Sequence, residues 1–139
     1  MVSEKLYEDI HVGDKASFSK TITEYDIYAF AGITGDFNPL HVDEQFASQT
    51  RFKKRIAHGM LSASLISTVL GTALPGRNTI YLEQEIKFTA PVYIGDTLTA
   101  EVCVTGKDDN RRIITLQTTV CNQEGKLVVE GRAKVMKTR

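Results

Sequence analysis

The sequence predicts an α+β fold in which a curved antiparallel sheet wraps around one long central helix. One stretch, 58–71, has the length of a helix, and its residues are apolar or small on every face. A helix without a charged side is typical of one that is buried all round. From about residue 78 to residue 138, apolar and polar residues alternate in several stretches separated by turns, as in antiparallel strands. Strands that share one apolar helix are most simply packed as a sheet on that helix.

The first third of the chain is expected to hold a strand, a helix and a turn. Weak alternation over 15–22 predicts the strand. Thr23 can cap a helix over about 24–31, with Asp26 where a capping box usually has Glu or Gln. This helix is expected to end near Gly32.

A turn over 34–41 is expected next. It contains Gly35 and the pair Asn38-Pro39, and a residue that precedes proline is pushed out of the helical region. A short helix over about 43–48 and a basic loop follow the turn. The loop contains Arg51, Lys53, Lys54 and Arg55.

Four alternating stretches predict the strands of the sheet. In the first, an apolar set alternates with a mostly charged set: Ile80, Leu82, Ile86 and Phe88 against Tyr81, Glu83, Glu85 and Lys87. The pattern recurs over 98–104, 114–120 and 127–135. Residues that favour turns lie between the stretches.

Length and charge limit the classes of protein to which the chain can belong. Its 139 residues are enough for one domain, so we expect a single domain over 1–139. Seventeen basic and seventeen acidic residues cancel, which gives no indication of a nucleic-acid partner. The uncharged stretch 59–76 is broken by three glycines and a proline, so no membrane span is expected.

The N-terminus and the cysteines indicate a cytoplasmic location. Residues 1–8 carry charges but no apolar core, and we therefore expect no signal peptide. Cys103 and Cys121 are expected to be reduced thiols, as is usual in the cytoplasm. Two cysteines do not make a zinc site, and no metal is expected.

The segment 28–48 contains the candidate catalytic residues. Asp36 and His41 lie five residues apart, with Asn38 between them, on a stretch that glycine and proline prevent from forming a continuous helix. A carboxylate and an imidazole held together can share one water molecule and shuttle a proton. The alternative is structural, because Asp and Asn before a proline often cap a turn. Spacing alone does not decide between the two interpretations.

This segment resembles the signature of the MaoC-like (R)-specific enoyl-CoA hydratases. The signature has an aromatic residue, a small residue, Gly-Asp-x-Asn-Pro-aliphatic-His, and then Ala or Ser after five residues. It is matched here by Tyr28 or Phe30, Thr34, Gly35, Asp36, Asn38, Pro39, Leu40, His41 and Ala47. Agreement continues in His58-Gly59-Met60, in Leu70-Gly71 to Pro75-Gly76 and in the run 88–96.

The resemblance implies a hot-dog fold, a homodimer whose sheets join, and a CoA thioester as the substrate, with no separate cofactor. It implies that Asp36 and His41 are catalytic and hold the attacking water, and that Asn38 orients the water or the carboxylate. The expected reaction is a reversible syn addition of water to trans-2-enoyl-CoA that gives (R)-3-hydroxyacyl-CoA. The enzyme class is therefore hydro-lyase.

Further site residues are expected along the buried helix. Gly59 lies at its N-terminus, where backbone N–H groups are unpaired and negative charge is stabilised, so its N–H can bind the thioester oxygen; the alternative is that the glycine only permits close packing of the helix. Ser62, Leu65 and Val69 are candidates for an acyl pocket. His58 is ambiguous between the start of the helix and the site, and the basic loop between a contact to CoA phosphates and a solvated surface.

Three other functions compete with the hydratase. Dehydration of 3-hydroxyacyl chains on acyl carrier protein uses the same chemistry in reverse. A hot-dog thioesterase needs a carboxylate but lacks the Gly-Asp-x-Asn-Pro-Leu-His signature. A non-catalytic binding module has no need of the acid–base pair Asp36 and His41.

Overall fold

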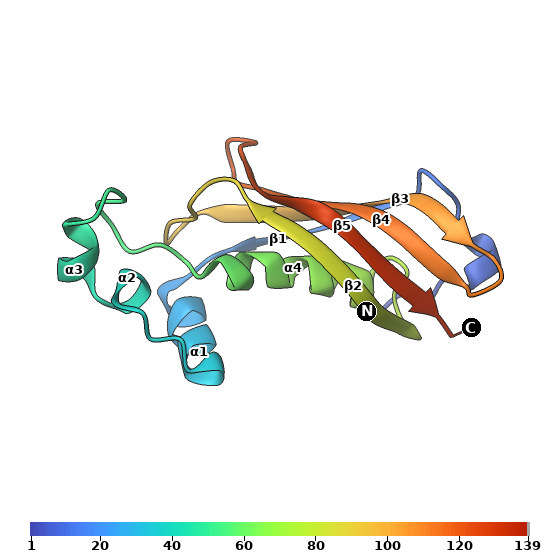
Figure 1. Ribbon diagram of the computed structural model, residues 1–139, viewed down its shortest axis with the longest axis horizontal. Coiled ribbons are helices and arrows are strands. Elements are labelled where there is room, and N and C mark those ends of the chain that lie inside the picture. The colour runs from blue at the N-terminus through green and yellow to red at the C-terminus, as the bar shows by residue number, and fades with distance from the viewer. Residues whose placement is uncertain (139) are drawn as a thin grey trace.

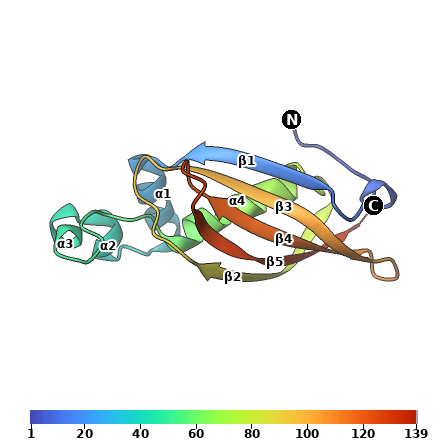
Figure 2. The ribbon, with the colours of Figure 1, turned by 90° about the horizontal axis from the view of Figure 1, so that it is seen from above.

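One antiparallel sheet of five strands curves over a single long helix in the computed structural model, which describes residues 1–138 (Figures 1 and 2). The strands are β1 (Lys15–Thr21), β2 (Thr79–Phe88), β3 (Thr97–Asp108), β4 (Ile113–Cys121) and β5 (Leu127–Lys137). Their order in the sheet is β1-β3-β4-β5-β2. The central helix is α4 (Gly59–Thr72). This arrangement confirms the α+β fold that the sequence predicts.

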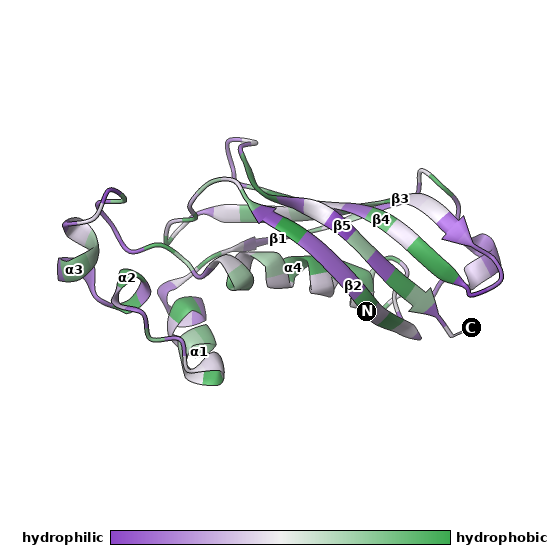
Figure 3. Cartoon of the chain, in the orientation of Figure 1, coloured by the Kyte–Doolittle hydropathy of each residue, from purple (hydrophilic) through white to green (hydrophobic). Residues whose placement is uncertain are grey.

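The core lies between the concave face of the sheet and one side of α4. Leu65, Ile66, Val69 and Leu70 of the helix are at most 5% exposed, and they join one apolar cluster with the inward residues of the strands. Helix α4 carries no strongly hydrophilic stripe (Figure 3). The expectation that it is buried all round is nevertheless wrong in the single chain, because its other side is exposed. That side carries Met60, Ser64, Ser67 and Gly71.

Three helices precede α4: α1 (Glu24–Thr34), α2 (Pro39–Val42) and α3 (Glu44–Ser48). Helices α2 and α3 lie beyond one end of the sheet in both views (Figures 1 and 2). The capping box at the start of α1 is confirmed, because the Thr23 hydroxyl accepts from the Asp26 N–H and the Asp26 carboxylate accepts from the Thr23 N–H. The helix ends at Gly35 rather than near Gly32. Gly35 has the positive φ of 82° that glycine adopts most easily.

The edge strand β2 departs from the alternation predicted for it. Its register against β5 shifts between Tyr81 and Glu83, and an extra residue at such a bulge changes which side chains share a face. Tyr81 therefore lies on the same face as Gln84 and donates a hydrogen bond to it. The sequence had placed Tyr81 with the charged outer residues instead.

The opposite end of the molecule is held by a polar network around the 3₁₀ helix η1 (Tyr7–Asp9). The Tyr7 hydroxyl donates to Asp109 over 2.7 Å, and Lys107 Nζ donates to the carbonyls of Tyr7 and Ile10. Burial, together with the hydrogen bond to Asp109, raises the pKa of Tyr7 to about 12.

Two further expectations concern the cysteines and the membrane. Cys103 and Cys121 are free thiols, and Cys103 lies opposite Gln117 on β4. Among residues 1–138, no helix has the length and apolar character needed to cross a membrane.

Candidate active site

The site begins with the turn between α1 and α2, which is held by its own side chains. The Asp36 N–H donates to the Thr34 hydroxyl, and the Asn38 N–H donates to the Asp36 carboxylate, each over 3.2 Å. Asn38 Oδ1 accepts from the Leu40 N–H and so caps α2, with Pro39 as the first helical residue. The sequence predicted only a turn here, and the single helical turn α2 places His41 on its inner side.

His41 is held in one tautomer. The residue is about 9% exposed, and its Nδ1 lies 2.7 Å from the carbonyl oxygen of Ile56. A carbonyl can only accept a hydrogen bond, so Nδ1 carries the proton and Nε2 keeps a free lone pair. His41 is therefore prepared to accept a proton at Nε2.

Asp36, His41 and His58 form one cluster. A carboxylate oxygen of Asp36 and one ring nitrogen of each histidine all lie within 4.8 Å of one another. One water molecule bridges two groups about 5 Å apart when each hydrogen bond is about 2.8 Å long. The two residues that the sequence nominated as the acid–base pair are therefore close enough to hold the same water molecule.

The same cluster has the residue types of a metal site, but its geometry favours proton transfer. The rings of His41 and His58 are stacked, with centroids 3.9 Å apart and an angle of 28° between planes. Lone pairs in the planes of stacked rings run nearly side by side and do not converge on one ion. One nitrogen of each ring also already faces a backbone carbonyl.

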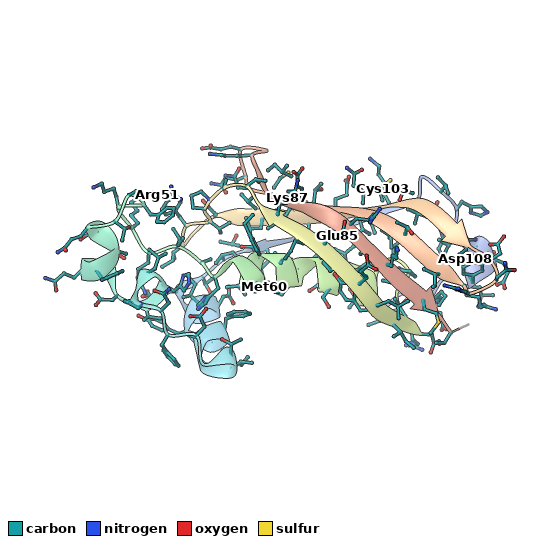
Figure 4. The ribbon with its side chains drawn as sticks, in the orientation of Figure 1. Arg51, Met60, Glu85, Lys87, Cys103 and Asp108 are labelled. Atoms are coloured by element: carbon teal, nitrogen blue, oxygen red, sulfur yellow. The ribbon has the colours of Figure 1, made fainter. Side chains whose placement is uncertain are left out.

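The cluster opens into a cavity of about 650 Å³ with mostly apolar walls. Its lining is Phe30, Thr34, Asp36, His41, His58, Gly59, Met60 and Phe88. Of these lining residues, Figure 4 labels Met60, at the start of α4; Arg51, also labelled, lies in the loop that follows α3. The cavity is large enough for a thioester group with part of its acyl chain.

Gly59 has the place in this cavity that the sequence predicted for it. As the first residue of α4, it has an N–H without an acceptor inside the helix. A Cβ atom at this position would lie 2.8 Å from Cε1 of Phe88. Glycine therefore lets the Phe88 ring pack closely against the N-terminus of α4, and any larger residue would make this ring shift.

The predicted acyl-pocket residues lie on a different face of α4 from the cavity. Leu65 and Val69 are in the core, and Ser62 lines a separate hollow of about 70 Å³ behind Gly59 and Phe88. A second apolar cavity of about 360 Å³ shares Phe30 and Met60 with the first. Its remaining lining is Ala63, Ser64, Ser67, Tyr81, Gln84 and Ile86.

Two site assignments remain predictions. Asn38 does not line the main cavity, and its side-chain oxygen is used by the cap of α2; only its amide N–H groups are left for the water or the carboxylate. The second is the contact between the basic loop and CoA phosphates. Arg55 is not available for this contact, because its side chain is buried.

Arg55 connects the helices around the site. Its guanidinium donates to Glu24 and Tyr28 of α1 and to Glu44 of α3. The hydrogen bond with Glu24 raises the pKa of Arg55 above its usual range, and the bond with Glu44 acts in the same direction against the effect of burial. The next residue, Ile56, supplies the carbonyl that holds His41. The sequence predicted either a contact to CoA phosphates or a solvated surface for the basic loop, and neither interpretation includes this role of Arg55.

The chain is similar in sequence to known proteins over most of its length. The family model described as MaoC like domain matches residues 10–126. The chain is 57% identical over 130 residues to an (R)-specific enoyl-CoA hydratase of Rhodospirillum rubrum, which covers 94% of this chain and 90% of the relative. It is 47% identical to an (R)-specific enoyl-CoA hydratase of Aeromonas caviae, over 92% of this chain and 96% of the relative.

A solved structure agrees with these sequences. An R-hydratase from Pseudomonas aeruginosa in its unliganded form matches with a TM-score of 0.91 and 46% identity, over 95% of this chain and 84% of that chain. The match confirms the hot-dog fold.

Replacing Arg55 tests its role as a connection between α1 and α3. Arg55→Met is expected to lower the free energy of unfolding by about 2 kcal/mol. A hydrogen bond to a charged group contributes about this much, and the exposure of Glu24 and Glu44 reduces what their ion pairs with Arg55 add. Urea unfolding followed by circular dichroism measures the change. Lys54→Met, in the same loop but exposed, is the control and should unfold like the wild type. Equal stability of the two variants would contradict the assignment.

Proposed function

The chain belongs to the MaoC-like domain family, and we propose that it is an (R)-specific enoyl-CoA hydratase. It is a hydro-lyase that adds water reversibly to trans-2-enoyl-CoA and forms (R)-3-hydroxyacyl-CoA. The observation that carries the mechanism is the placement of the Asp36 carboxylate and the His41 imidazole within reach of one water molecule, at the wall of an apolar cavity.

In the proposed reaction, His41 and Asp36 hold the attacking water between them. The free lone pair on His41 Nε2 accepts a proton from the water as its oxygen bonds to C3 of the enoyl group. The electron pair of the double bond moves onto the thioester oxygen. The proton on His41 then passes to the Asp36 carboxylate, and Asp36 delivers it to C2 as the thioester carbonyl re-forms, so that both groups return to their starting states.

The thioester oxygen carries the negative charge that develops in this step. The Gly59 N–H, at the N-terminus of a helix of fourteen residues, is the donor that we assign to that oxygen. The partial positive charge at a helix N-terminus supports the same interaction. One such donor is worth about 3 kcal/mol of barrier in acyl-transfer enzymes.

The syn course of the addition follows from the position of the pair. Asp36 and His41 lie together on the wall of the cavity, so the hydroxyl and the proton reach the substrate from the same side. The addition is therefore syn. The mechanism needs no cofactor, because water, substrate and these side chains account for every proton and electron pair.

We also propose that the enzyme works as a homodimer in the cytoplasm. The exposed side of α4 has no charged residue, and the edge strand β2 exposes the apolar residues Ile80, Leu82 and Phe88 by 45–53%. An apolar edge strand beside an uncovered helix is a surface that a second copy can cover by strand pairing. The cytoplasmic location is supported by the two free cysteines.

Substitution of the acid–base pair tests the proposed activity. Asp36→Asn and His41→Gln are each expected to lower kcat for hydration of crotonyl-CoA by about 10³-fold, because each removes a proton-transfer group. Loss of the enoyl absorbance measures the rate, and chiral analysis of the product tests the (R) configuration. Asp9→Asn and His11→Gln, at exposed positions in the N-terminal segment, are the matched controls. Full activity in both site variants would overturn the mechanism.

The nature of the thioester carrier needs its own test. We expect a higher kcat/KM with crotonyl-CoA than with crotonyl acyl carrier protein. The reverse preference would make the enzyme a 3-hydroxyacyl carrier-protein dehydratase with the same catalytic residues. Release of free thiol without loss of the enoyl group would instead indicate a thioesterase.

Sedimentation equilibrium tests the dimer. The wild type is expected at twice the chain mass of 15.4 kDa. Leu82→Lys, which places a charge on the exposed edge strand, should shift the equilibrium toward the single chain. Val12→Lys changes an exposed apolar residue outside the sheet and should leave the dimer intact. A wild type that sediments as a single chain at micromolar concentration would contradict the proposal.

A further inference from the structure

His58 occupies the N-cap of α4, but its side chain does not cap the helix. N-cap residues usually accept a hydrogen bond from the first turn, and the His58 side chain forms no such bond. The residue is 2% exposed, and its ring is turned toward the turn that carries the acid–base pair. Neither the proposed reaction nor the helix start therefore accounts for a histidine here.

His58 contacts both members of the acid–base pair. Its Nε2 lies 2.9 Å from the backbone carbonyl oxygen of Asp36, and its ring stacks on the ring of His41 at 3.9 Å between centroids. The ring of Phe30 packs against it from another direction, with centroids 4.8 Å apart. One side chain thus fixes the backbone at one catalytic residue and the ring plane of the other.

The hydrogen bonding of His58 also argues against a purely structural role. Because the Asp36 carbonyl only accepts, Nε2 of His58 carries the proton and Nδ1 is left as an acceptor. Within residues 1–138, this buried Nδ1 has no hydrogen-bond partner. An unpaired buried nitrogen is unfavourable, so a histidine at this position carries a cost that an apolar ring of similar size would avoid.

We propose that His58 is a positioning residue for the acid–base pair, an inference that rests on the proposed hydratase function. The Nε2–H bond holds the Asp36 backbone, and the ring face holds His41 in the plane that directs Nε2 at the shared water. His58 itself neither donates nor accepts a proton in the reaction.

Two variants separate the two contacts of His58. His58→Phe keeps an aromatic ring against His41 but loses the N–H donor, whereas His58→Gln keeps a donor but loses the ring. Each is expected to lower kcat for crotonyl-CoA by about 10-fold, and His58→Ala by about 100-fold, the range found when partners that orient a reacting group are removed. KM should stay within about twofold, because His58 orients the pair and does not hold the CoA.

Thermal unfolding separates positioning from a structural role. His58→Phe removes the unpaired nitrogen and should unfold at the wild-type temperature or above it, while its kcat falls. His11→Gln, at an exposed histidine, controls for loss of an imidazole and should match the wild type in both measurements. If His58→Phe proves unstable, the comparison of His58→Gln with His58→Ala still tests the partial retention of kcat.

The outcomes distinguish this inference from the proposed function. If the wild type and the His58 variants all fail to hydrate crotonyl-CoA, the hydratase proposal itself is overturned. If the wild type is active and Asp36→Asn is not, but folded His58→Phe and His58→Gln both keep wild-type kcat, only the positioning role is overturned. A lower unfolding temperature with unchanged kcat would make His58 a structural residue.

Discussion

The hydrogen bond between His41 Nδ1 and the Ile56 carbonyl is the interaction on which the rest of the site depends. It places the proton of the neutral ring on Nδ1 and leaves Nε2, the other nitrogen of this cavity-lining residue, as the acceptor. Ile56 can hold His41 only because its own segment is fixed. The Ile56 N–H donates to the Leu40 carbonyl, Ile56 bridges Tyr93 in antiparallel fashion, and the Ala57 N–H donates to the Val92 carbonyl. This short segment therefore joins the helices beyond the sheet to the connection between β2 and β3.

Helix α4 has two functions, and both favour small or apolar residues over charged ones. Its inner side fills the sheet and must be apolar, while its N-terminus must approach the reacting thioester without a side chain in the way. Gly59 satisfies the second requirement because it has no side chain of its own, and the Phe88 ring packs where its Cβ atom would lie. A charged residue in the first turn would change the field at the same place, and α4 has none there. The uncharged composition of α4 thus suits both the apolar core and the negative charge that develops on the thioester oxygen.

The sequence predicted those features that depend on local pattern. Alternation located all five strands, the absence of charge located α4, and Thr23 with Asp26 located the start of α1. Features that depend on distant partners were missed. The bulge after Tyr81 is invisible in an alternating pattern until the partner strand is known. Gly32 and Gly35 are equally plausible helix ends by sequence, and the left-handed backbone at Gly35 decides between them. Arg55 and His58 act on residues 11 to 31 positions away.

Two of the four buried side-chain atoms that lack a hydrogen-bond partner within residues 1–138 lie beside the site. Around Tyr7, at the end of the molecule far from the cavity, hydroxyl, ammonium and carbonyl groups pair with one another, although Arg112 Nε near the Tyr7 ring has no partner. In the first turn of α4, the part of the chain that the structure describes leaves His58 Nδ1 and Ser62 Oγ buried without a partner. Buried polar groups of this kind lower stability, and unfavourable local arrangements tend to collect at functional sites that the surrounding fold can hold in place. The network at the far end and the apolar core supply that support. The stacked histidines can therefore stay beside the turn that carries Asp36, although that arrangement is not the most stable one for the helix.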